Sequence, residues 1–119
     1  MELQQEVKKI VRLAIAAIEE KKGVDPVVLD ISKITVIADC FVIASADNDR
    51  QLEALAESVK DTLGRAGIDC KSVEGFKRSG WVLFDYGDVI VHLFNRETRS
   101  FYDLERIYRD AVRVDLSEL

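Results

Sequence analysis

The segment from Cys40 to Ala46 (CFVIASA) restricts the fold more than any other part of the sequence. Side chains along a β-strand point alternately to the two faces of a sheet, and here both sets are apolar or small. Such a strand has to be covered on both faces, so we expect it to be central in its sheet. A strand of this kind, with helical patterns before and after it, favours an α/β architecture.

Two amphipathic helices are predicted on either side of this strand. Apolar residues at three- and four-residue spacing indicate one helix over residues 3–21, with Gly23 as its stop. The other is capped by Asp47 or Asn48 and ends at Gly67. Its apolar stripe consists of Leu52, Leu55, Ala56, Val59 and Leu63.

Four further strands complete the expected sheet. Residues 27–31 alternate in polarity, and the charged segment 68–74 suits an edge strand. Residues 81–86 and 89–94 form a hairpin around Gly87-Asp88, a pair suited to a type II′ turn. The predicted fold is a single α/β domain over residues 1–119, with about five strands in a mixed sheet packed with helices.

A last helix is expected after a connection over residues 95–99. Ser100 and Asp103 resemble a capping arrangement at its start. Its apolar residues are Phe101, Leu104, Ile107, Tyr108 and Ala111.

The hairpin turn also predicts which side chains share a face. With Trp81 opposite Phe94, one face is almost uniformly apolar and suited to packing under helices. The other face combines these two aromatic residues with Asp85 and the chain's single histidine, His92. Aromatic anchors beside a few polar groups are typical of a protein interface. The same face could instead be a second core layer under a helix, with Asp85 bonded to His92.

Composition narrows the class of partner. The chain has 119 residues and a formal charge of -5, so it lacks the basic surface that broad nucleic-acid binding needs. A basic partner, such as a ribosomal protein, suits it better. Neither a signal peptide nor an apolar run long enough to span a membrane is visible, so we expect a cytoplasmic protein. Cys40 and Cys70 have no disulfide or metal-site spacing and are expected to be at least half-buried.

Three segments resemble the ribosomal silencing factor (RsfS/iojap) family. Residues 38–45 (ADCFVIAS) are similar to the family's ADYFVIASG strand, and residues 85–94 (DYGDVIVHLF) to its DYGDVVVHVF hairpin. Residues 101–106 (FYDLER) are similar to its FYDLERLW helix start, and Glu74-Gly75 before Trp81 matches its spacing. Cys40 departs from the tyrosine usual in the family, and Ala46-Asp47 departs from the usual small pair.

This resemblance implies a nucleotidyltransferase-like fold without catalytic activity, cofactor or metal. It also implies binding to the large ribosomal subunit through the ribosomal protein of the L-fourteen family. The bound domain would block joining of the small subunit. A homodimer is an alternative that the sequence leaves undecided, and no membrane partner is expected. The candidate partner-binding residues are Trp81, Asp85, Tyr86, His92, Phe94, Arg99 and Tyr102.

Two other functions compete with this hypothesis. Asp47 and Asp49 could hold a metal ion in a nucleotidyltransferase, although helix capping explains them better, because no glycine-serine phosphate loop precedes them. Alternatively, C-terminal arginines could contact RNA, although interspersed acids favour a solvated helix face. These arginines are Arg96, Arg99, Arg106, Arg109 and Arg113.

Overall fold

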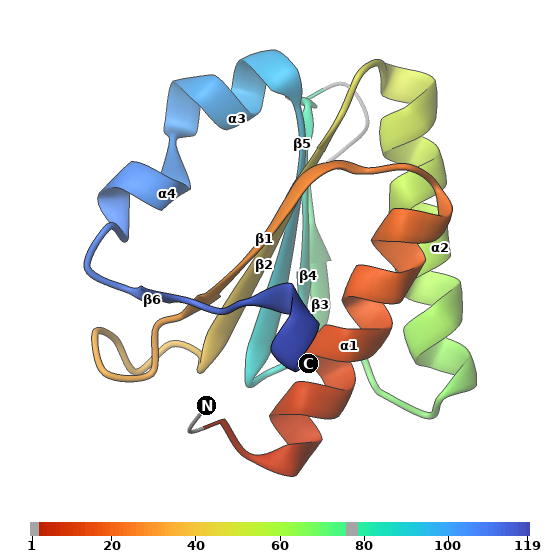
Figure 1. The fold of residues 1–119 in the computed structure, drawn as a ribbon. Coiled ribbons are helices and arrows are strands. Elements are labelled where there is room, and N and C mark those ends of the chain that lie inside the picture. Colours follow the sequence, from red (N-terminus) through yellow and green to blue (C-terminus); the bar gives the residue numbers. More distant parts are fainter. Residues whose placement is uncertain (1–2, 76–78) are drawn as a thin grey trace.

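The computed structural model describes residues 3–75 and 79–119, and Figure 1 shows their arrangement. In chain order the elements are α1 (Gln5–Glu20), β1 (Val24–Asp30), β2 (Cys40–Ala46), α2 (Asp49–Arg65), β3 (Ser72–Glu74), β4 (Trp81–Asp85), β5 (Val89–Asn95), α3 (Arg96–Tyr102), α4 (Leu104–Ile107), β6 (Val112–Arg113) and the 3-10 helix η2 (Leu116–Glu118). The α/β class and the order of elements up to β5 are therefore as predicted.

The strands form one mixed sheet in the order β3-β4-β5-β2-β1-β6. Among the described residues, β2 pairs in parallel with β5, and the other neighbouring strands pair antiparallel. All residues of β2 are buried, which confirms its central position. The sheet has six strands instead of about five, because the two-residue β6 adds to β1. A strand that short has too few residues to show an alternating pattern.

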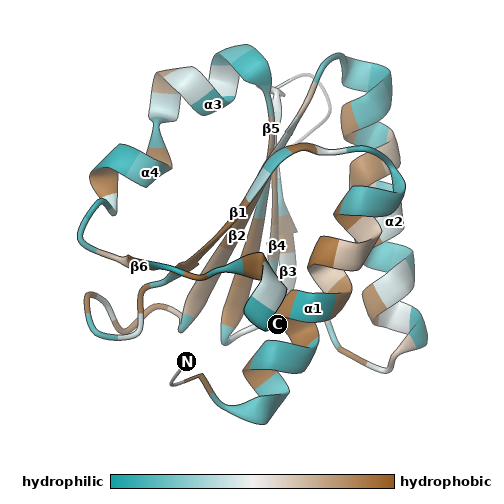
Figure 2. Ribbon diagram, viewed as in Figure 1, coloured by the Kyte–Doolittle hydropathy of each residue, from teal (hydrophilic) through white to brown (hydrophobic). Residues whose placement is uncertain are grey.

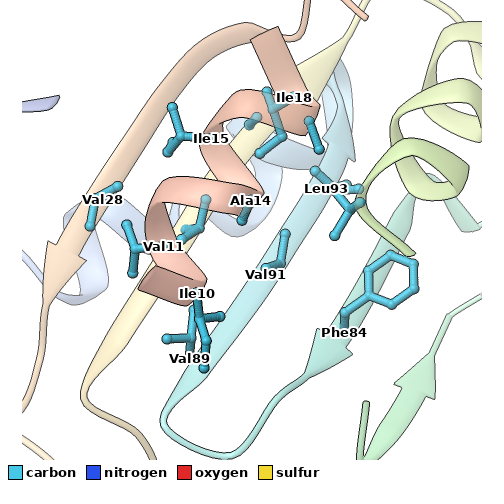
Figure 3. Packing of buried hydrophobic residues seen from close by; sticks show 14 of the residues in the cluster. Ile10, Val11, Ala14, Ile15, Ile18, Val28, Phe84, Val89, Val91 and Leu93 are labelled. Atoms are coloured by element: carbon cyan, nitrogen blue, oxygen red, sulfur yellow. The ribbon is translucent and has the colours of Figure 1, made fainter. Parts of the chain in front are cut away.

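Helices α1 and α2 cover one face of the sheet (Figure 1). The buried side of α1 lies over β5 and β1, as the close view in Figure 3 shows for Val11, Ala14 and Val91. The helix stripes predicted from the sequence face the sheet, and Asn48 caps α2, where its side chain accepts a 2.8 Å hydrogen bond from Gln51 N. This face therefore holds the larger hydrophobic core.

The opposite face is covered by α3, α4 and the chain that leads into β6 (Figure 1). A smaller core joins Phe41, Ile43 and Phe94 of the strands to Leu104 and Tyr108 of the C-terminal segment. In Figure 2 α3 is mostly teal and white, and neither α3 nor α4 contains a fully buried residue. This second layer is therefore thinner than the first, and its edge is open to solvent.

The C-terminal helix differs from the prediction. The expected connection over residues 95–99 is already helical, and the helix breaks at Asp103, which adopts a left-handed φ of 47°. As a result Phe101 and Ile107, which were expected in one buried stripe, are 81% and 63% exposed. The strand predicted over residues 68–74 shortens to β3. In the described part of the chain no helix is long and apolar enough to cross a membrane.

The two cysteines lie in different environments. Cys40 is buried in the centre of the sheet, as expected, whereas Cys70 is exposed. The prediction for Cys70 was wrong because residues 68–71 precede β3 and run along the open edge of the sheet.

Candidate functional site

The β4–β5 hairpin has the register predicted from its turn. Trp81 pairs with Phe94, Leu83 with His92 and Asp85 with Ile90. Gly87 adopts a φ of 87°, which a glycine tolerates in a tight turn. The face with Trp81 and His92 is the one opposite α1 and α2, so the aromatic residues lie under the thinner layer.

Aromatic side chains on this face run from the core to the surface. Phe94 and His92 are buried, and the ring of Trp81 stacks on Phe94 with centroids 5.2 Å apart. Tyr102 of α3 packs on Trp81 at 4.6 Å and is itself touched by the exposed Phe101. Together with Leu83, which neighbours Trp81 on β4, the accessible aromatic residues form a surface that we name the aromatic patch. It consists of Trp81, Leu83, Phe101 and Tyr102. The inner part of this face is therefore core, and its outer part is accessible to solvent.

His92 is held in its neutral form. Its Nδ1 accepts a 3.2 Å hydrogen bond from the Trp81 indole Nε1–H, so the ring proton resides on Nε2. Among the described residues, Nε2 is buried without a hydrogen-bond partner. Burial disfavours the charged imidazolium and lowers the pKa of His92 to about 4.

Asp85 and Tyr86 lie apart from the aromatic patch. Asp85 accepts a 2.7 Å hydrogen bond from Gly87 N at the turn. It does not accept one from His92, because the Nε2–H of His92, which could donate, has no partner among the described residues. Tyr86 is buried on the face covered by α1 and α2, where burial, followed by interaction with Cys70, raises the pKa of its phenol.

Arg99 joins α3 to the rest of the protein. Its guanidinium donates to Val24 O at 3.0 Å, to Ser45 Oγ at 3.2 Å and to the Glu105 carboxylate at 2.9 Å. Only 13% of this side chain is exposed, so Arg99 holds α3 in place under Tyr102 and is not itself an accessible contact.

A cavity of about 250 Å³ lies beside the aromatic patch, and sequence reasoning did not anticipate it. Trp81, Leu83 and Tyr102 form its apolar walls, and Glu74, Gly75 and Ser79 complete the lining. At Gly75, with a φ of 85°, a Cβ atom would lie 2.0 Å from Trp81 O. Only glycine fits this close approach, and the spacing of Glu74-Gly75 before Trp81 was the one sequence signal for it.

The two competing hypotheses concern the acids Asp47 and Asp49 and the C-terminal arginines. Asp47 forms a short ion pair with Arg96, and Asp49 lies in the first turn of α2. The described residues contain no group of three or more side chains suited to a metal ion. Arg106 is exposed and lies 3.8 Å from Asp103, whereas only 13% of the Arg99 side chain is exposed, so these two arginines do not share one accessible surface.

Comparison with known proteins identifies the family. The family model described as "Ribosomal silencing factor during starvation" matches residues 4–119. A ribosomal silencing factor from Bacillus subtilis is 41% identical over 109 residues, with 92% of each chain covered. A crystal structure of a Chromobacterium violaceum protein, 42% identical, superposes with a TM-score of 0.82 over 85% of this chain and 84% of that one.

A more distant relative is the mouse protein named "Mitochondrial assembly of ribosomal large subunit protein 1". It is 25% identical over 101 residues, which cover 81% of this chain and 43% of that protein. The segments that resembled silencing factors in the sequence form the central strand, the hairpin and the aromatic end of α3 in the structure. Together, these matches show that the chain belongs to the ribosomal silencing factor family.

Proposed function

We propose that this protein is a translational repressor that binds the large ribosomal subunit through the ribosomal protein of the L-fourteen family. Bound there, the folded domain occupies space that the small subunit needs, so subunit joining and translation fall. The observation that carries this proposal is the match of residues 4–119 to the silencing-factor family. The name of the mouse relative, which refers to the large subunit, supports the choice of subunit.

The aromatic patch is the proposed docking surface for the ribosomal protein. Trp81 and Tyr102 are large, partly accessible and held by packing, which is typical of residues that dominate binding energy. The acidic chain, with a net charge of -5, complements a basic ribosomal protein. His92 and Phe94 support the patch from below, and Arg99 positions α3, so their part in binding is indirect.

Co-sedimentation with isolated subunits tests this function. We expect the protein to travel with large subunits, to be absent from small subunits, and to lower the yield of joined ribosomes when it is added before joining. Equal or stronger association with small subunits would refute the proposal.

We also propose that the protein acts without catalysis. Asp47 is engaged by Arg96, and Asp49 lies in the first turn of α2, where its charge complements the helix dipole, so both acids are explained without a metal ion. We expect Asp47→Ala combined with Asp49→Ala to leave large-subunit binding and the block of subunit joining largely intact. Metal-dependent nucleotide transfer that disappears in this double variant would overturn the assignment.

A further inference from the structure

We infer that the cavity beside the aromatic patch binds a cationic side chain, preferably an arginine, of the partner protein. This inference rests on the proposed function for the identity of the partner, but the chemistry of the cavity stands by itself. The arginine side chain would be the group of the partner that the docking surface recognises.

The walls of the cavity suit a delocalised cation. Trp81 and Tyr102 both line it, and their rings are in contact, with ring planes at 45° and centroids 4.6 Å apart. Aromatic rings attract a cation through the negative charge of their faces, and tryptophan does so most strongly. Arginine is favoured over lysine because its planar guanidinium stacks on rings and is less strongly hydrated.

A carboxylate at the rim supplies the opposite charge. Glu74 lines the same cavity, at the end of the edge strand β3, and its partner across the ladder is Leu83. Among the described residues no ion pair engages Glu74, whereas Asp47, Asp103 and Glu105 each pair with an arginine. An incoming guanidinium could therefore stack on the rings and bond to this carboxylate.

The pairing of Trp81 with His92 strengthens the site. Because the indole N–H is already bonded to His92 Nδ1, Trp81 offers no donor to a carboxylate or carbonyl in the cavity. Neutral His92 also places no positive charge beneath the ring, since burial lowers its pKa to about 4. Both features favour a cation over an anion in the cavity.

A test uses the single tryptophan of the chain as its reporter. The indole ¹H–¹⁵N signal of Trp81 is followed at constant ionic strength during titration with N-acetylargininamide. N-acetylcitrullinamide, which has nearly the same shape without the charge, serves as the control ligand. We expect a saturable shift with the arginine probe and little with citrulline. Equal shifts with both probes would overturn the inference.

Two variants that make the same change in net charge test whether the Glu74 carboxylate contributes to binding. Glu74→Gln should lower the affinity for the arginine probe about five-fold, which is the scale of one exposed charge interaction. Glu57→Gln makes the same change in net charge on the exposed side of α2 and should leave the titration unchanged. If Glu74→Gln binds the arginine probe as well as the unaltered protein does, the carboxylate has no part in binding and the inference is wrong.

The same variants separate this inference from the proposed function. In large-subunit co-sedimentation, Glu74→Gln should lower the affinity about five-fold, and Glu57→Gln should not. Probe binding without any association with large subunits would refute the proposed function while leaving the cavity chemistry in place. Association that Glu74→Gln leaves unchanged would show that the partner does not insert a cation there, and would overturn the inference.

Discussion

The indole N–H of Trp81 donates a hydrogen bond to Nδ1 of His92 over 3.2 Å, and the same indole contacts the ring of Tyr102 with centroids 4.6 Å apart. Trp81 therefore packs against the core and also forms part of the exposed aromatic patch. Its truncation should lower both stability and partner affinity, because it would remove the stacking on Phe94 and the exposed ring together.

Tyr102→Ala separates these two roles. Tyr102 is 41% exposed, so we expect a loss of less than about 1 kcal/mol in the free energy of unfolding. We expect large-subunit affinity to fall about 30-fold, corresponding to about 2 kcal/mol for an interface anchor. Ile107→Ala, an exposed apolar truncation on α4, is the matched control. If Tyr102→Ala binds as tightly as this control, the aromatic patch is not the docking surface.

His92 should make the stability depend on pH. Its pKa is about 4 in the folded protein against about 6.5 in an unfolded chain. Between these values the unfolded state binds a proton that the folded state does not, so stability falls as the pH falls from 6.5 to 4. The contribution reaches about 3 kcal/mol at the acidic end.

Chemical denaturation of the protein and of His92→Phe at several pH values measures this effect. The variant lacks the titrating ring, so its stability should decline less over the same range. Parallel pH profiles for the two proteins would show that the burial of His92 has no such consequence.

Arg99 should be needed for stability, because its guanidinium satisfies Val24 O, Ser45 Oγ and Glu105 at once. We expect Arg99→Ala to cost about 2 kcal/mol by thermal or chemical unfolding, since it removes three hydrogen bonds made by a largely buried guanidinium. Arg106→Ala removes an arginine of the exposed pair with Asp103 and should cost less than about 0.5 kcal/mol. Similar unfolding midpoints for both variants would contradict the structural role of Arg99.

Thiol labelling should distinguish the two cysteines. Burial, aided by Asp30 and Asp39, raises the pKa of Cys40 to about 12, and Cys70 is exposed. A thiolate-specific reagent should label a single thiol rapidly in the folded protein and both after denaturation. Cys70→Ser should abolish the rapid reaction. Rapid labelling that persists in Cys70→Ser would mean that Cys40 is accessible.

The salt dependence of ribosome binding tests the C-terminal arginines. Arg106 and Arg109 are exposed, but Asp103 and Asp110 lie beside them in the sequence, so we expect a solvated surface without phosphate contacts. Replacing both arginines by alanine should leave the slope of log affinity against log salt unchanged. Contact with RNA would flatten it by about two, about one per phosphate lost. Arg50→Ala combined with Arg65→Ala on α2 makes the same change in net charge and serves as the control.

The local sequence pattern was enough to predict the central strand and the register of the hairpin. The doubly apolar run Cys40–Ala46 predicted the buried strand, because a strand's alternation assigns each side chain to a face. Gly87-Asp88 predicted the register of Trp81 against Phe94, because a two-residue turn leaves one pairing for the flanking strands. Two of the three family-like motifs fell on these same elements, and the third fell on the end of α3 and the start of α4.

The exposure of the aromatic face depends on how distant parts of the chain pack together. Asp103 breaks the C-terminal helix in a left-handed conformation that no periodicity signals, and this break leaves Phe101 exposed while Tyr102 meets Trp81. The choice of Trp81 over Asp85 as the partner of His92, and the position of Glu74 beside the rings, depend on contacts between elements far apart in the chain. Such contacts follow from how layers pack, which a one-dimensional pattern does not encode.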